Sequence, residues 1–221
     1  MTEKFDHLAK IRDKNIKFRK WKVKDKNKFL SANRDPKIIK EALVYDCLRD
    51  EKIALSEDEY KYLLMRIRAE SLPNSISYTF RCDECLEEYD YTADLKQIMK
   101  PEFSKYGIVQ SGIHSFEMTS IRNREFYDNV IGAYVNDEQK LLVDFILHIK
   151  SYNQNESLDF DGLNDIINNL DVDAFEDIFA QWEAMRFKVN NIHTVQCPHC
   201  KAQETYEFDD LPGFFPESWN I

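Results

Sequence analysis

Two cysteine pairs carry the clearest chemistry in this sequence of 221 residues. Cys82 and Cys85 form one C-x-x-C motif, and Cys197 and Cys200 form a second. A C-x-x-C motif on a hairpin turn presents both sulfurs to one side, and two such turns complete the four-thiolate shell that is typical of structural Zn²⁺. We therefore predict one structural zinc ion, bound by these four cysteines.

Paired cysteines also occur in redox sites and in disulfides. A thioredoxin-like dithiol opens a helix after a strand of a βαβ unit, and neither pair has that context. Disulfides are typical of oxidising compartments, whereas the N-terminus lacks the apolar stretch of a secretory signal. We therefore expect a reducing compartment. If one thiolate were displaced from the metal, His193 or His199 would be a lesser candidate for a substitute ligand. Cys47, alone on an apolar helix face, is expected to be a buried core thiol.

Each cysteine pair is flanked by sequences that favour β-strands. The expected strands are Ser75–Arg81 and Glu88–Tyr91 around the first pair, and Val189–Gln196 and Glu204–Phe208 around the second. A strand, a C-x-x-C turn and a strand make a zinc knuckle, and two knuckles make a zinc ribbon. Because 111 residues separate Cys85 from Cys197, the ribbon is predicted to be split by a large insertion.

The region before the first knuckle is expected to be mainly helical. We expect a short exposed helix in the first fifteen residues, a strand at Ile16–Val23, and helices at Lys24–Ala32, at Pro36–Asp50 and from Ser56 onward. Ser56 and Glu59 have the spacing of a capping box, in which each side chain satisfies a backbone N–H group at the helix start.

The segment between the knuckles is also expected to be mainly helical. Residues 108–120 can hold one or two strands, and four helices are expected at 123–135, 137–150, 159–170 and 173–187. The run from Asp159 to Gly162 is similar to a calcium loop, but two key carboxylate positions of such a loop hold Ser157 and Asn168. A helix start capped by an aspartate is the better interpretation.

These elements predict an α+β fold: a split four-cysteine zinc ribbon with a helical N-terminal region and a large helical insertion. We expect one zinc-stapled unit overall, in which the ion links the two knuckles. Its segments are the N-terminal basic arm and helices (1–74), the first zinc knuckle (75–97), the mainly helical insertion (98–187), the second zinc knuckle (188–210) and an aromatic C-terminal tail (211–221).

Charge is distributed unevenly along the chain. Residues 1–40 contain 14 Lys or Arg against 5 Asp or Glu, whereas the remaining 181 residues contain 16 against 35. This basic arm either meets nucleic acid or an acidic partner, or lies across the acidic remainder of its own chain. The formal net charge of −10 argues against nonspecific nucleic-acid binding, which depends on neutralising phosphates.

Five aromatic residues are the candidates for contact with a partner protein. Phe18 and Trp21 lie in the basic arm, and Phe214, Phe215 and Trp219 lie in the Pro-flanked tail. Aromatic side chains are enriched among residues that carry binding energy at interfaces. The alternative for the tail is that it folds back over the core.

Catalytic motifs and membrane segments are absent from the sequence. It contains no G-x-S-x-G, H-E-x-x-H or phosphate-binding glycine loop. No run approaches the roughly 20 apolar residues of a membrane span. We therefore predict a protein that is not an enzyme and has no membrane partner.

The order of features between Phe18 and Leu95 resembles a known family. A short basic strand and the Lys-rich segment Val23–Leu30 precede a helix that ends with the run Arg66–Ser71. A strand, the first cysteine pair and Tyr89–Leu95 follow. This order resembles the baseplate hub assembly proteins of T-even-like contractile-tailed phages, while the second knuckle and the Phe-Phe tail match more loosely.

The resemblance implies a late phage protein that is needed to build the hub or wedge of the tail baseplate and that has no catalytic residues. Its implied partners are other baseplate or hub proteins. Its implied location is the host cytoplasm during assembly, with the tail baseplate of the virion as a second location. The alternative function is a zinc-ribbon adaptor for nucleic acid or transcription, which the basic arm favours and the acidic remainder opposes.

Overall fold

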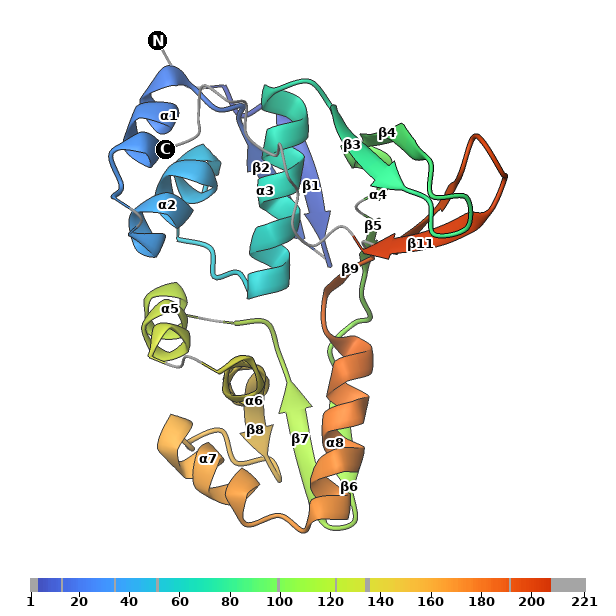
Figure 1. Cartoon of the computed structure of the whole chain (residues 1–221). Coiled ribbons are helices and arrows are strands. Elements are labelled where there is room, and N and C mark those ends of the chain that lie inside the picture. The colour runs from blue at the N-terminus through green and yellow to red at the C-terminus, as the bar shows by residue number, and fades with distance from the viewer. Residues whose placement is uncertain are drawn as a thin grey trace. The chain divides into compact units, whose positions relative to one another are not determined.

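The chain divides into two compact units, each with helices and strands, which confirms the α+β class (Figure 1). This computed structural model describes residues 4–12, 14–33, 35–50, 52–98, 100–121, 123–133, 136–190 and 192–207. Unit 1 is built from the described residues of 1–51, 58–102 and 189–221, and unit 2 from those of 52–57 and 103–188. Unit 1 therefore contains both cysteine pairs.

Unit 1 combines small two-stranded sheets with short helices. Its elements before the first cysteine pair are β1 (His7–Ile11), β2 (Lys14–Phe18), α1 (Val23–Leu30), α2 (Pro36–Leu43), the 3-10 turn η1 (Tyr45–Cys47), α3 (Glu57–Ser71) and β3 (Ser75–Arg81). After the pair come β4 (Glu88–Asp94), α4 (Leu95–Ile98) and β5 (Lys100–Glu102), and then, beyond unit 2, β9 (Lys188–Asn190), β10 (Ile192–Gln196) and β11 (Gln203–Glu207).

The N-terminus of unit 1 corrects one prediction. The exposed helix expected in the first fifteen residues is wrong, because β1 occupies His7–Ile11 and pairs antiparallel with β2. Ala9 and Ile11 alternate with exposed residues, as Ile16 and Phe18 do in β2, so the period-2 pattern begins earlier than expected. The basic arm is thus a hairpin followed by helices.

The helices of unit 1 begin where expected, but α2 is shorter. Asp35 caps α2, and its carboxylate accepts from the N–H groups of Lys37 and Ile38 at 2.8 and 3.3 Å. The helix ends at Leu43 instead of near Asp50, because Val44 leaves the helical conformation and η1 follows. Helix α3 begins directly after Ser56, where the capping box places its start.

Two hairpins carry the cysteine pairs. Strands β3 and β4 pair antiparallel over seven residues, from Ser75 opposite Asp94 to Arg81 opposite Glu88. Strands β10 and β11 pair antiparallel in the same manner, and β9 pairs with β5. The expected strand–C-x-x-C–strand pattern is therefore present twice (Figure 1).

The described residues of unit 2 form a three-stranded antiparallel sheet and four helices. Its elements are β6 (Ile108–Ser111), β7 (His114–Met118), α5 (Arg124–Gly132), α6 (Asp137–Leu147), β8 (Ile149–Tyr152), α7 (Phe160–Asn168) and α8 (Val172–Met185), with the sheet order β6-β7-β8. All four helices were expected, but the helix predicted to run to Lys150 ends at Leu147 and gives way to β8.

Aromatic side chains fill the core of unit 2. Phe116 of β7, Phe145 of α6 and Trp182 of α8 are fully buried, and the ring of Phe145 lies 5.3 Å from that of Trp182.

Among the helices that the structure describes, none has the length and apolar character of a membrane span.

Candidate metal centre

The first cysteine pair lies on the turn between β3 and β4. The Cys82 N–H donates to the Glu87 carbonyl at 3.0 Å, directly beyond the last strand pair, and the Leu86 N–H donates to the Cys82 carbonyl at 2.9 Å. Leu86 has a φ of 62°, a left-handed conformation that lets the chain reverse after Cys85. The turn thereby holds Cys82 and Cys85 in one loop.

The second cysteine pair lies on a turn with the same pattern of backbone hydrogen bonds. The Cys197 N–H donates to the Ala202 carbonyl at 2.9 Å, and the Lys201 N–H donates to the Cys197 carbonyl at 3.0 Å. Lys201 has a φ of 69°, as the equivalent Leu86 has in the first turn. Two turns of one design therefore present two pairs of sulfur atoms.

The four sulfur atoms form one compact group. The Sγ atoms of Cys82 and Cys200 lie 3.6 Å apart, those of Cys85 and Cys197 lie 3.8 Å apart, and all four lie within 4.8 Å of one another. Four ligands at about 2.3 Å from a tetrahedral zinc are separated by about 3.8 Å. A disulfide needs about 2.05 Å, and all four cysteines are free thiols. The donor set and spacing therefore fit one tetrahedral metal ion.

The exposure of the thiols differs within the group. Cys82 and Cys197 are fully buried, Cys85 is half-buried and Cys200 is exposed. A closed structural site places its ligands between packed hairpins, whereas a reactive dithiol requires an accessible nucleophile. The first cysteine of each pair is the buried one, so the group resembles a structural site.

Backbone N–H groups favour the thiolate form of at least one sulfur. Burial raises the pKa of Cys197, but the N–H groups of Cys200 and His199 and the neighbouring thiols outweigh burial and lower it to about 7. Metal ligation requires thiolates. The pKa values of Cys82 and Cys85, by contrast, are raised, so of these three thiols the turn donors favour the thiolate at Cys197 only.

Glu204 on β11 links the two knuckles, a role that no local sequence pattern indicates. Its Oε1 accepts from the backbone N–H of Asp83 at 2.9 Å, and its other oxygen accepts from the Tyr206 hydroxyl. These hydrogen bonds lower the pKa of the Glu204 carboxyl, with the Tyr206 bond as the largest cause. The charged carboxylate thus connects the first turn to the second hairpin beside the sulfur group.

Aromatic packing connects the same hairpins below the cysteines. The ring of Phe80 on β3 stacks on that of Tyr206 on β11, with ring centres 4.0 Å apart. Tyr89 and Val195 are buried with Cys82 and Cys197 in one apolar cluster. The two knuckles therefore share a small core as well as the sulfur group.

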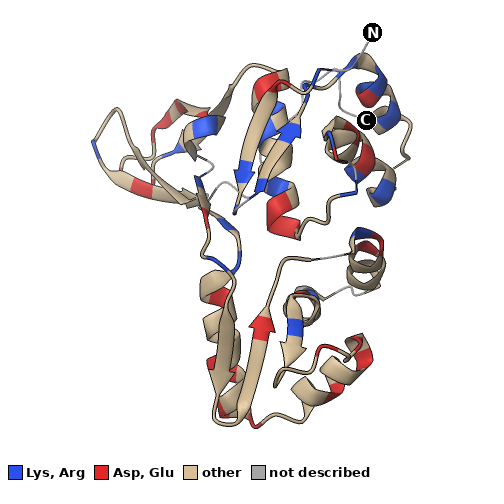
Figure 2. Cartoon of the chain, turned by 180° about the vertical axis from the view of Figure 1, so that it is seen from behind, with Lys and Arg blue, Asp and Glu red and all other residues tan. Residues whose placement is uncertain are grey.

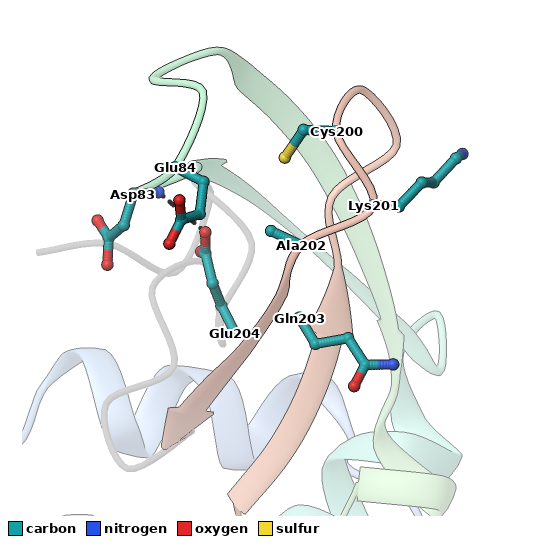
Figure 3. A pocket seen from close by; sticks show the side chains of 7 residues that line it. All are labelled: Asp83, Glu84, Cys200, Lys201, Ala202, Gln203 and Glu204. Atoms are coloured by element: carbon teal, nitrogen blue, oxygen red, sulfur yellow. Dashed lines mark hydrogen bonds between the residues drawn. The ribbon is translucent and has the colours of Figure 1, made fainter.

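An open hollow of about 580 Å³ lies at the outer side of the sulfur group. It is lined by Asp83, Glu84, Cys200, Lys201, Ala202, Gln203 and Glu204 (Figure 3). The carboxylates of Glu84 and Glu204 lie near one another, whereas the Lys201 side chain points away from them. The exposed side of the candidate metal centre is therefore acidic.

Comparison with known proteins assigns the family. The family model described as T4 bacteriophage base plate protein matches residues 2–216. The chain belongs to this family. The match covers both knuckles and the segment between them, confirms the resemblance seen in the sequence, and gives the chain a structural role in the phage base plate. No curated protein and no solved structure matches the chain.

In this base plate protein, the aromatic residues of the basic arm belong to the packing of unit 1. Phe18 is fully buried and its ring stacks on His7 at 5.4 Å. Trp21 is half-buried, and its indole N–H donates to the Leu43 carbonyl at 2.7 Å. The proposal of Phe18 as a contact for a partner is therefore wrong, because its side chain has no exposed surface.

Several basic side chains of the arm pair with carboxylates of the same unit. Arg19 donates to both oxygens of Asp25 at 2.6 and 3.0 Å, and Lys28 donates to Asp46 at 2.8 Å. Arg12 lies 3.4 Å from Glu59. Of the two interpretations of the basic arm, these pairs support the one in which it lies against acidic residues of its own chain.

The remaining candidate residues have structural positions or lie outside the described residues. Cys47 is fully buried, and burial raises its pKa to about 12, as expected for a core thiol. Asp159 caps α7 by accepting from the Gly162 N–H at 2.9 Å, so the helix start is the correct interpretation of that run. Among the described residues, neither His193 nor His199 joins the sulfur group. Phe214, Phe215 and Trp219 lie outside the described residues.

Proposed function

We propose that this base plate protein is a non-enzymatic component that acts through protein–protein contacts, with one Zn²⁺ bound by Cys82, Cys85, Cys197 and Cys200. The observation that carries the proposal is the group of four sulfur atoms within 4.8 Å in a chain of the base plate family. With these thiolates bound to the ion, their role is structural.

The choice of zinc rests on the chemistry of the donors. Four thiolates form a soft ligand set, which selects zinc or iron over magnesium, calcium and manganese. A closed four-cysteine shell on two knuckles is the usual coordination of structural zinc. Binding to small zinc peptides contributes roughly 10–16 kcal/mol, and that free energy is coupled to folding. One ion between Cys85 and Cys197 also fixes two parts of the chain that are distant in sequence.

The proposed partners are other base plate or hub proteins, met in the host cytoplasm during assembly and retained in the tail baseplate of the virion. The contact residues proposed from the sequence are Phe214, Phe215 and Trp219 of the tail, together with the exposed part of Trp21. Large aromatic side chains are frequent anchors at interfaces.

Affinity capture from infected cells tests this function. The tagged full chain, expressed during infection by the phage that encodes it, is recovered and its partners are identified by mass spectrometry. Enrichment of base plate proteins over a tagged unrelated phage protein supports the proposal. Enrichment of RNA polymerase subunits, or of nucleic acid that nuclease treatment removes, contradicts it and assigns the zinc-ribbon adaptor function.

A further inference from the structure

The outer face of the β1–β2 hairpin is basic around one apolar residue. Leu8 stands opposite Lys17 in the pairing, Lys10 is two residues along the same strand, and alternation places all three on one face. Arg49 lies on this face too, because its N–H donates to the Lys17 carbonyl at 3.0 Å beside the Phe18–Leu48 bridge. Leu8 is 55 % exposed at its centre.

The cations of this face lack partners within the described part of the chain. Lys10, Lys17 and Arg49 are exposed and form no ion pair with any described carboxylate. In this they differ from Arg12 and Arg19, whose side chains are buried and paired. Figure 2 shows the basic colour on both strands of the hairpin. We call Leu8, Lys10, Lys17 and Arg49 the basic face.

Helix α8 carries a surface of opposite charge around a similar apolar residue. Asp173, Glu176 and Asp177 share one side of the helix because their spacing is i, i+3 and i+4. Val172, four residues before Glu176, is 70 % exposed. The sequence contains no Lys or Arg from Ser151 to Met185, and Figure 2 shows only acidic and uncharged residues on α8. We call Val172, Asp173, Glu176 and Asp177 the acidic face.

The acidic face is also available to a partner. Asp173 and Glu176 are exposed and pair with no Lys or Arg among the residues that the structure describes. Among the described residues, the Asp177 carboxylate accepts only from the Gln181 side chain, at 3.2 Å, which leaves its charge unneutralised. Each face therefore combines unpaired charges with one exposed aliphatic side chain. The charges of the basic face are opposite to those of the acidic face, and the two aliphatic side chains can pack against one another.

We propose that the basic face binds the acidic face of a second copy of this chain. The contact joins two different surfaces, so it is head-to-tail, and repetition produces a ring or an open chain of copies. Exposed charges steer and orient such an encounter, while Leu8 and Val172 supply apolar area at its centre. This inference depends on neither the metal nor the proposed base plate contacts.

Charge reversal of each face tests the proposal in solution. Lys10→Glu/Lys17→Glu changes the basic face, and Asp173→Lys/Glu176→Lys changes the acidic face. Lys37→Glu/Lys61→Glu is the matched control for the first variant, because both lysines are exposed in unit 1 and lie outside the basic face. Circular dichroism establishes that each variant is folded, and light scattering after size exclusion gives the mass.

We expect the mass of the wild type and of the control to rise with concentration at low salt. The rise should fall when salt reduces the Debye length from about 10 Å at 0.1 M to about 3 Å at 1 M. Each face variant alone should be monomeric, with a dissociation constant raised about tenfold or more. An equimolar mixture of the two face variants should recover association, because the intact acidic face of one variant meets the intact basic face of the other. The two reversed faces are also opposite in charge, so the mass of the mixture should rise with concentration, whereas that of each variant alone should not.

Four results would overturn the proposal. The first is a wild type that is monomeric at every concentration, and the second is association of the face variants equal to that of the wild type. A change in hydrodynamic radius at constant mass on reversing either face would assign the contact to a single chain. Binding of random-sequence DNA that is lost in Lys10→Glu/Lys17→Glu, without self-association, would assign the basic face to nucleic acid.

Discussion

At the scale of single residues, Arg19 shows how a basic arm becomes part of a core. Its side chain is 2 % exposed, and besides its two bonds to Asp25 it donates to the Asp46 carbonyl at 2.7 Å. Asp25 is equally buried and also accepts from the Lys22 N–H at 2.7 Å, at the start of α1. The pair therefore connects the end of the hairpin to the first helix and to the chain before Cys47.

Replacing Arg19 by methionine should lower the free energy of unfolding by roughly 3 kcal/mol or more, because it leaves the Asp25 charge buried without a partner. Arg19→Met/Asp25→Asn should recover part of this loss, since the amide is neutral and its oxygen still accepts from Lys22. Urea denaturation measures both, with Lys20→Met as the exposed neighbour control. Equal losses in Arg19→Met and Lys20→Met would contradict this role.

The residue scale also shows what the sequence can predict. The four cysteines were identifiable because their spacing and chemistry are local properties. The prediction of Phe18 as a contact is wrong for a simple reason. An aromatic residue between lysines is compatible with an exposed surface and also with a strand that buries one of its faces, and the sequence pattern is the same in both cases. Glu204 had no local signal, since its role depends on the Asp83 N–H, which is 121 residues away in the sequence.

At the scale of elements, the start of α7 illustrates a local signal that determines structure. Asp159 is the N-cap, with extended backbone, and its side chain satisfies the Gly162 N–H group. Leu163 and Ile167 then face the core of unit 2. The cap therefore fixes where the buried side of the helix begins.

Asp159→Ala should destabilise α7 by about 1 kcal/mol, the usual effect of losing an N-cap side chain. Hydrogen exchange of the α7 amides, followed by mass spectrometry, should show faster exchange there. Asp165→Ala, at an exposed position inside the same helix, is the control and should leave the exchange nearly unchanged. Equal exchange in Asp159→Ala and the wild type would show that the cap does not hold the helix.

The tail is an element that only the sequence predicts, because it lies outside the described residues. Truncation after Leu211 should abolish capture of base plate partners and leave thermal unfolding unchanged, since Phe214, Phe215 and Trp219 are proposed as contacts. Capture from infected cells and thermal denaturation measure the two effects. A large loss of stability would place the tail in the core, and no change in either would move the contact surface elsewhere.

Strand β8 shows why some elements escape prediction. The apolar pattern of residues 137–150 continues through His148 and Ile149 without a glycine or proline, so it predicts one helix. In the structure, His148 ends α6, and its Nδ1 lies 2.7 Å from the Asp144 carbonyl. Ile149 then pairs with Met118 of β7. Pairing with a distant strand determines this boundary, and no local signal reports it.

At the scale of the whole molecule, the candidate metal centre lies between segments that unit 2 separates in the sequence. The hairpins β3–β4 and β10–β11 meet through the sulfur group, the Phe80–Tyr206 stack and the bond from Asp83 to Glu204. The metal should therefore supply much of the free energy that holds the second hairpin on unit 1.

Cys82→Ser and Cys200→Ser should each destabilise the whole chain, because the proposed zinc ion is bound by both knuckles at once. The expected loss is several kcal/mol, a large part of the roughly 5–15 kcal/mol that stabilises a typical protein. Thermal unfolding by circular dichroism measures it. Cys47→Ala is the matched control, since this buried thiol lies outside the sulfur group and its loss should leave metal content unchanged. Unchanged unfolding in both serine variants would mean that the centre does not contribute to stability.

The metal content of the purified chain tests the central claim most directly. Elemental analysis of folded protein, prepared without added metal, should give about one zinc per chain, because four thiolates at tetrahedral spacing bind one ion. Cys82→Ser, measured in parallel, should hold much less. A zinc content near zero in the folded wild type, or equal zinc in Cys82→Ser, would contradict the account.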